Sequence, residues 1–314
     1  CGTVYGRSWS EGELAEAPGV TSYLKRLIRA LAAYQVADVI SKFMAVLLLP
    51  VYTRYISPSG YGVVELLGNG VIFISILTRF GMIEAFLRYY FTDQDQGRRD
   101  ALARQAVLFT LVATTLVAGA LAGAAEPLSR LVLSHRDPTT FRIAVLGLWS
   151  FTNLELAYGL LRVDERVRAY ATATLINVAG TIVSSVVLVV GLHQGARGLL
   201  LGNYATATVV LVGLWWTMRR RLLAPEPKRP SQAVRVERLA TLLRFGLPTV
   251  PAEASVYALS IVDRYYVYHN RSQALAGLYS IAIKLAGAVA FIVRAFQYAW
   301  PPLAYSVTDD AEAA

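Results

Sequence analysis

The sequence predicts an all-α fold, a polytopic membrane helix bundle with about eight transmembrane helices. Of its 314 residues, 55% are hydrophobic and only 16% are charged, whereas roughly 25% of residues are charged in an average soluble domain. Apolar runs long enough to cross a bilayer recur along the whole chain. These runs are apolar on every face, unlike the alternating strands of a barrel. The composition therefore argues against a soluble enzyme and against disorder.

The elements follow in order from these apolar runs. Residues 1–23 contain Glu11, Glu13 and Glu16 and no apolar segment, so we interpret them as a cytoplasmic leader. Residues 305–314 are a predicted cytoplasmic tail. Because the chain begins at Cys1 rather than Met, we expect it to be a fragment. The repeat described below further predicts that the chain is truncated at its C-terminal end. The predicted spans are 27–49, 63–87, 102–124, 141–161, 171–191, 197–217, 242–267 and 275–299.

The distribution of Lys and Arg predicts the orientation of these spans. Basic residues concentrate in segments 88–104, 162–168 and 219–238, which all lie on one side of the membrane in the predicted order. Cytoplasmic loops carry such an excess, so we expect a cytoplasmic N-terminus. The net charge of +9 is then a signal of topology and of attraction to anionic membrane lipids, and we expect no nucleic-acid partner.

A basic segment and a weak repeat divide the chain into two parts. Residues 219–238 contain three prolines and are predicted to be a cytoplasmic linker. Ser57 to Gly62 has a counterpart much later in the chain, Ser272 to Gly277, and the same spacing carries Arg79 onto Arg294. This spacing of 215 residues is called the repeat offset. We therefore predict a six-helix lobe over residues 24–218 and the first two helices of a second lobe over 239–304, both in the same orientation.

Several charges fall inside the predicted spans, where an unpaired charge costs about 2.5 to 3.5 kcal/mol. Asp38 and Lys42 are four residues apart, so they either form an internal ion pair or face a cavity. Arg79 and Arg294 have no acid three or four residues away on their own helices. They either extend towards the inner surface or face a central cavity, where two guanidiniums would bind an anionic group such as a phosphate. Lys284 is a further candidate cavity cation.

Glu253 lies close to two prolines in predicted span seven. Pro248 and Pro251 precede it, which places the carboxylate at a helix start or kink at membrane depth. Such an acid is either a proton or sodium site or a satisfied structural carboxylate.

Catalytic signatures are not found in the sequence. It has no phosphate-binding P-loop, no GxGxxG, no GxSxG and no HExxH motif, and His135, His193 and His269 all fall in predicted outer loops. We therefore expect neither an enzyme nor a cofactor or metal site. A membrane glycosyltransferase is a distant third hypothesis, because its catalytic residues would need a larger outer loop than this chain offers.

Short motifs recur along the chain at Leu48 to Gly62, Arg79 to Met82, Arg88 to Tyr90, Asp263-Arg264, Gly277 to Tyr279 and Ala299 to Pro301. These motifs resemble those of the polysaccharide biosynthesis flippases, which belong to the superfamily of multidrug, oligosaccharidyl-lipid and polysaccharide exporters. The resemblance covers residues 24–304. It implies 12 to 14 helices in two six-helix lobes around a V-shaped cavity, and the movement of lipid-linked sugars from the inner to the outer leaflet.

Two functional hypotheses remain after this resemblance. The first is a flippase for a lipid-linked oligosaccharide, a precursor of O-antigen, capsule or exopolysaccharide, in a bacterial inner membrane; a polysaccharide polymerase and a chain-length regulator would be candidate partners. The second is an ion-coupled multidrug or metabolite antiporter, whose cavity would be dominated by acids. The candidate cations Lys42, Arg79, Lys284 and Arg294 outnumber the acids Asp38 and Glu253, which favours the flippase.

Overall fold

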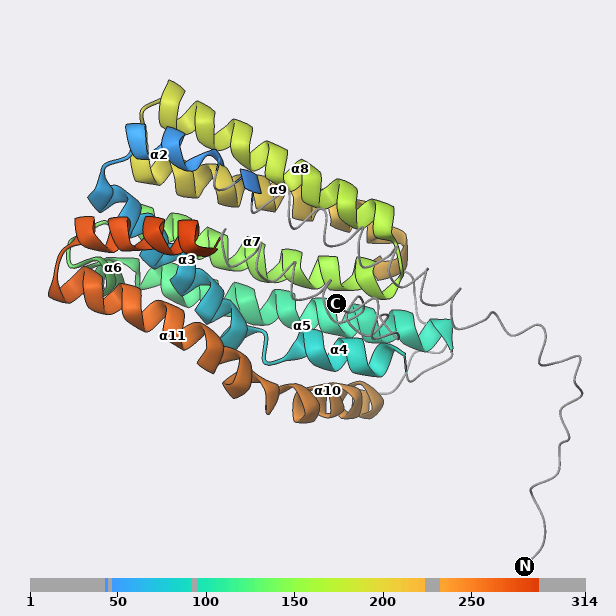
Figure 1. The fold of residues 1–314 in the computed structure, drawn as a ribbon. Helices are drawn as coiled ribbons and strands as arrows, with labels where there is room; N and C mark the ends of the chain where they lie inside the picture. The colour runs from blue at the N-terminus through green and yellow to red at the C-terminus, as the bar shows by residue number, and fades with distance from the viewer. Residues whose placement is uncertain (1–42, 45–46, 92–94, 224–231, 288–314) are drawn as a thin grey trace, which may run out of the picture.

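The computed structural model describes residues 43–44, 47–91, 95–223 and 232–287. Long helices run roughly side by side through the molecule, and the described residues contain no strand (Figure 1). The predicted all-α membrane bundle is therefore confirmed. Its helices are α2 (Leu49–Tyr55), α3 (Pro58–Thr78), α4 (Met82–Tyr90), α5 (Gln96–Gly123), α6 (Ala125–Leu133), α7 (Pro138–Val163), α8 (Val167–Val186), the π-helical turn η1 (Val187–Gly191), α9 (Gly195–Leu223), α10 (Gln232–Gly246) and α11 (Thr249–Asn270). Residues 273–287 are also helical.

Five helical segments of the described chain are long and apolar enough to cross a membrane. They are α3, α5, α7, α8 together with η1, and α9, and they coincide with predicted spans two to six. Span one lies mostly outside the described residues, and span eight is described only as far as residue 287. The helix at span seven, α11, is not among the five. It carries three charged residues, Glu253, Asp263 and Arg264.

Polar caps start two of these helices at defined residues. The Ser57 side chain accepts a hydrogen bond from the backbone N–H of Gly60 (3.1 Å), and Pro58 opens α3. Asp137 caps α7 in the same way by accepting from the Thr140 N–H (3.1 Å), with Pro138 as the first helical residue. A proline is favoured at this position because its missing N–H would have no partner within the helix.

Helix α7 is the centre of the bundle. Its most apolar 18-residue stretch is 72% buried, against 22% for the corresponding stretches of α5 and α8. Helices α5 and α8 thus keep most of their apolar surface on the outside, where bilayer lipid would cover it. The Tyr204 ring of α9 packs directly on Gly147 of α7, where any side chain would overlap the ring.

Two predicted spans are each divided into two helices. Predicted span 63–87 breaks between α3 and α4, where Phe80 and Gly81 adopt positive φ angles of 51° and 65°. Predicted span 242–267 breaks between α10 and α11 at Leu247 and Pro248. A proline removes one helical hydrogen bond and ends the preceding helix. Residues 219–223 and 232–238 of the predicted linker are helical and belong to α9 and α10.

Candidate functional site

The two broken helices pass each other at their breaks. The carbonyl of Gly246, at the end of α10, lies directly against the α-carbon of Gly81 between α3 and α4. A side chain on Gly246 would in turn lie 2.6 Å from the Gly81 carbonyl oxygen. Helix α11 then runs alongside α3, and α10 runs alongside α4 (Figure 1). The polar groups around these breaks form the first part of the candidate site.

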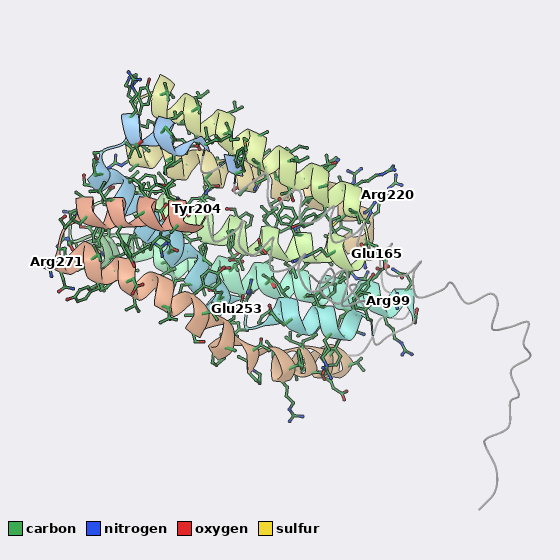
Figure 2. All side chains as sticks on the ribbon, in the orientation of Figure 1. Arg99, Glu165, Tyr204, Arg220, Glu253 and Arg271 are labelled. Atoms are coloured by element: carbon green, nitrogen blue, oxygen red, sulfur yellow. The ribbon has the colours of Figure 1, made fainter. Side chains whose placement is uncertain are left out.

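Arg79, the last residue before the break in α3, is paired with Glu253 in the first turns of α11. The guanidinium donates through Nη2 to a carboxylate oxygen of Glu253, and Glu84 of α4 lies 3.9 Å from the same nitrogen. The Arg79 side chain is only 9% exposed, while that of Glu253 is 30% exposed. Figure 2 shows Glu253 near the junction of α10 and α11.

One donor of Arg79 remains unused. Its Nε is buried and has no hydrogen-bond partner. A guanidinium presents five N–H donors in a rigid fork that fits carboxylates and phosphates. A buried donor without an acceptor costs about 1 to 3 kcal/mol, so this fork can gain from a further acceptor.

Lys284 forms the second cationic part of the site. Its ammonium donates to the Tyr61 hydroxyl (2.8 Å) and to a carboxylate oxygen of Glu65, both on α3. It also lies 5.1 Å from the centre of the Tyr61 ring. The Glu65 side chain is 10% exposed and that of Lys284 is 37% exposed, so the acid is buried and the base reaches the edge of the interface.

At the interface between α3 and helical residues 273–287, two glycines lie directly against main-chain atoms of the opposite segment. A side chain on Gly62 would overlap the Gln273 carbonyl oxygen, and one on Gly277 would overlap the Pro58 carbonyl oxygen. The contact is reciprocal, because the repeat offset carries Pro58 onto Gln273 and Gly62 onto Gly277. This reciprocal contact is the pattern expected for two helices that are related by a local two-fold axis.

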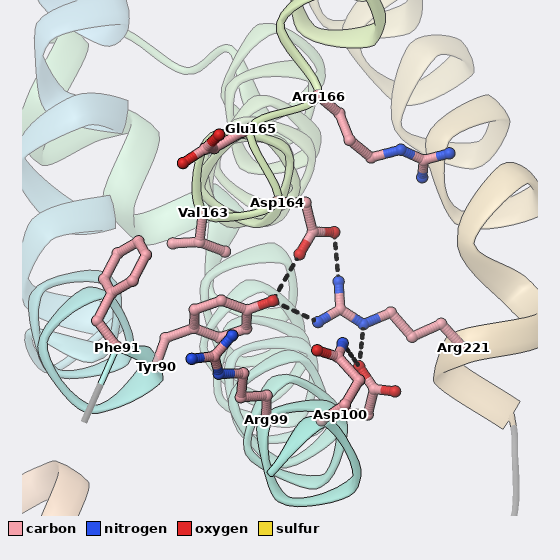
Figure 3. Close-up of a pocket in the computed structure, with 10 residues that line it drawn as sticks. Tyr90, Phe91, Arg99, Asp100, Val163, Asp164, Glu165, Arg166 and Arg221 are labelled. Atoms are coloured by element: carbon pink, nitrogen blue, oxygen red, sulfur yellow. Dashed lines mark hydrogen bonds and ion pairs between the residues drawn. The ribbon is translucent and has the colours of Figure 1, made fainter. Parts of the chain in front are cut away.

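A third polar cluster lies at the opposite end of the bundle, where α4, α5, α7 and α9 end or begin (Figure 3). Arg221 donates to Asp100 (2.5 Å), to Asp164 and to the Tyr90 hydroxyl (3.2 Å), and Tyr90 itself donates to Asp164 (2.8 Å). The cluster borders a cavity of about 580 Å³. The charges around this cavity balance, since Asp100, Asp164 and Glu165 face Arg99, Arg166 and Arg221. We interpret the cluster as structural, because its ion pairs and hydrogen bonds hold four helix ends together.

Three of the predicted site residues lie at one interface. Arg79, Glu253 and Lys284 all lie between α3 and the segments from 246 onwards. Arg79 obtains its counter-charge from another helix, as its sequence context required, and that partner is Glu253. Asp38, Lys42 and Arg294 lie outside the described residues.

Glu65 is a site residue that was not predicted; it stands among apolar residues of α3 and has its partner 219 residues away. Among the described residues, the two candidate cations therefore lie within ion-pair distance of three carboxylates, those of Glu65, Glu84 and Glu253, and the excess of cations inferred from the sequence is not seen there. The described residues contain no group of three or more His, Cys, Asp or Glu side chains that could hold a metal ion.

The apolar helices define a multi-pass membrane protein. The sequence matches the family described as "Polysaccharide biosynthesis protein" over residues 27–304. The chain belongs to this family, as its motifs predicted. Among curated proteins, none matches the chain.

Solved structures of transporters share the fold. A MATE protein in complex with Br-NRF has a TM-score of 0.57 at 18% identity, covering 73% of this chain and 54% of its own. An inward-facing multidrug resistance MATE transporter of the MOP superfamily has a TM-score of 0.58 at 16% identity, covering 80% and 57%. A MOP superfamily transporter from Pyrococcus furiosus, described as having a binding pocket of reverse polarity, has a TM-score of 0.55 at 16% identity, covering 93% and 75%. The chain thus spans slightly more than half the length of the first two transporters.

Proposed function

We propose that this chain belongs to a flippase that moves a lipid-linked oligosaccharide from the cytoplasmic to the outer leaflet by alternating access. The substrate class is a sugar chain on a polyprenyl pyrophosphate, a precursor of O-antigen, capsule or exopolysaccharide. The membrane would be a bacterial inner membrane, with the N-terminus in the cytoplasm. Membership in the polysaccharide biosynthesis family supports this class of substrate.

The observation that carries the proposal is the buried guanidinium of Arg79 with its unused Nε donor. Two oxygens of a phosphate can accept from Nε and Nη2, which gives a charge-assisted, bidentate contact. Glu253 holds the same guanidinium in the absence of substrate and would release it when the pyrophosphate binds. Arg294, at the repeat-equivalent position, is proposed as the second guanidinium and Lys42 as a further cation of the cavity.

Lys284 has a related role in the proposal. Its ammonium already holds Glu65, so it would bind substrate only when that pair opens. Asp38 and Glu253 remain candidate ion-coupling or structural acids. A polysaccharide polymerase and a chain-length regulator are the proposed protein partners, because the flipped precursor must be consumed by chain-extending enzymes.

A multidrug or metabolite antiporter is the second candidate. The described site favours it, because three carboxylates there face two cations, and an antiporter for cationic drugs requires acids in its cavity. The similarity to MATE structures reflects the shared fold and fits both candidates.

A reconstitution experiment distinguishes the two candidates. The purified protein is placed in lipid vesicles with a fluorescent polyprenyl-pyrophosphate sugar, and the label exposed on the outer leaflet is bleached with dithionite. We expect the protein to increase the bleached fraction, and we expect ethidium not to be transported. Ethidium transport without lipid movement would establish the antiporter instead.

Variants of Arg79 test the role of the guanidinium. R79A leaves Glu253 unpaired and endangers folding, so R79Q/E253Q, which removes both charges, is the informative variant. We expect it to fold and to lose lipid movement, while R79K keeps part of the activity. Arg130→Ala on the exposed surface of α6 is the matched control. Lipid movement at the normal rate in R79Q/E253Q would overturn the assignment.

A further inference from the structure

The Glu65–Lys284 pair lies immediately beside the glycine contact that joins α3 to helical residues 273–287. Glu65 is three residues beyond Gly62, one helical turn further along α3. Lys284 is seven residues beyond Gly277, two turns further along its own helix. The ammonium can reach Glu65 and Tyr61 because the glycines allow the two backbones to approach closely. The ion pair therefore exists only while these two helices touch.

The Glu65–Lys284 pair does not follow the local two-fold symmetry of the glycine contact beside it. By the repeat offset, the counterpart of Glu65 is Ser280, and the counterpart of Lys284 is Asn69. Ser280 is fully buried, and its hydroxyl has no hydrogen-bond partner. Asn69 donates to the backbone carbonyl of Glu65 (2.7 Å). The two equivalent positions thus carry neutral side chains, whereas Glu65 and Lys284 are one acid and one base.

Separation of the two helices would leave the buried Glu65 carboxylate without its cation. An ionised group that loses its partner in a poorly hydrated site is strongly disfavoured. A proton bound to a Glu65 oxygen removes the negative charge, and Lys284, the more exposed of the two side chains, keeps its own charge. Near Lys284 lie Tyr52, Tyr61 and Glu65, and Tyr204 lies near Glu65. Of these groups only Glu65 is a carboxylic acid.

We propose that Glu65 is a proton-binding site that opens and closes the contact between α3 and helical residues 273–287. With Glu65 ionised, the salt bridge to Lys284 holds the helices together beside Gly62 and Gly277. A proton taken from water neutralises Glu65, breaks the salt bridge and lets the helices separate. With the predicted topology this contact is at the outer end of the bundle, so outer protons favour the opening of that end. The inference does not depend on the identity of the transported substrate.

Spin-label distances test this inference in the full chain. Cys1, the single cysteine, is first replaced by Ser. Labels are then placed at Ser59, which is partly exposed near the start of α3, and at Leu275, which is exposed on the helix of residues 273–287. The labelled protein is reconstituted in lipid nanodiscs. We expect a short, narrow distance distribution at pH 8 and a growing long-distance population as the pH is lowered. In E65Q the long-distance population should be present at pH 8 and should no longer respond to pH.

Two further variants separate the ion pair from general loss of packing. The exchanged pair E65K/K284E should restore the short distance at pH 8, because the salt bridge is rebuilt with its charges reversed. Glu126→Gln removes the acid of an exposed ion pair within α6 and should leave the distances and their pH response unchanged. A pH response that survives in E65Q, or a short distance that E65Q leaves unchanged, would overturn the proposal.

Discussion

Gly62 and Gly277 lie backbone against backbone, at positions that the repeat offset makes equivalent. Each α-carbon faces a carbonyl oxygen of the other helix. The relationship joins two segments far apart in the sequence, and it leaves no space for even a methyl group on either side.

Alanine at Gly62 should therefore destabilise the protein. The added carbon would overlap the Gln273 carbonyl oxygen, and such overpacking costs about 1 to 3 kcal/mol. Thermal unfolding in detergent, followed by circular dichroism, should show a lower midpoint for G62A and G277A. Gly70, on the same helix α3, has no atom within 4 Å of the added carbon, so G70A is the matched control. Equal midpoints for G62A and G70A would contradict the close contact.

The polar cluster around Arg221 predicts that replacing this one residue strongly lowers the stability of the protein. R221A leaves Asp100 and Asp164 without their shared cation, and the removal of one partner from a buried ionic network costs about 3 kcal/mol. We expect the midpoint of thermal unfolding to fall clearly. The neighbouring Arg220 is exposed, so R220A should change the midpoint little. If both variants unfolded alike, the cluster would not hold the helix ends together.

Asp137 predicts a dependence of stability on pH at the start of α7. Burial alone would raise the pKa of Asp137, but hydrogen bonds from Thr140 and the nearby Arg197 guanidinium outweigh it and lower the pKa below 3.8. A lowered pKa in the folded state stabilises the protein above the ordinary value and loses this effect as the pH falls. Asparagine can still cap the helix, but D137N loses the charge that faces Arg197, so it should be less stable than the native chain by up to about 1 kcal/mol at pH 7. The difference should shrink below pH 3.8, and denaturant unfolding at several pH values measures it; a constant difference would refute the argument.

The orientation of the chain gives a prediction that needs no purified protein. Reporter fusions within residues 92–100 and 222–236 should be cytoplasmic, whereas fusions within 133–138 and 269–273 should lie outside, because the basic residues concentrate in the first two segments. An outside signal from a fusion at residue 230 would show that the orientation is reversed.

The sequence predicted the long helices well because a bilayer requires a fixed length of apolar residues. The helices at spans 102–124, 141–161 and 171–191 all appear in the structure. The helix breaks were not predicted. Gly81 breaks a helix through its positive φ, but a glycine inside an apolar run has no distinct signal, since other glycines of the chain continue their helices.

The sequence predicted several individual residues of the candidate site, but it did not predict which of them form pairs. Arg79, Glu253 and Lys284 were identified because charges are rare in apolar spans. Their pairing depends on how distant helices pack, as Arg79 and Glu253 are 174 residues apart. Glu65 could have been found by the same search for charges, because it also lies inside a predicted span.

The contact between Gly81 and Gly246 limits how this protein can change during evolution. In most packed interfaces a larger residue on one side can be accommodated by a smaller one opposite. Here both partners are already glycine, and each would meet main-chain atoms of the other. No second substitution at the facing position can relieve the first. The two positions should therefore remain glycine together in close homologues, and random mutagenesis with selection for function should recover almost no substitutions at either.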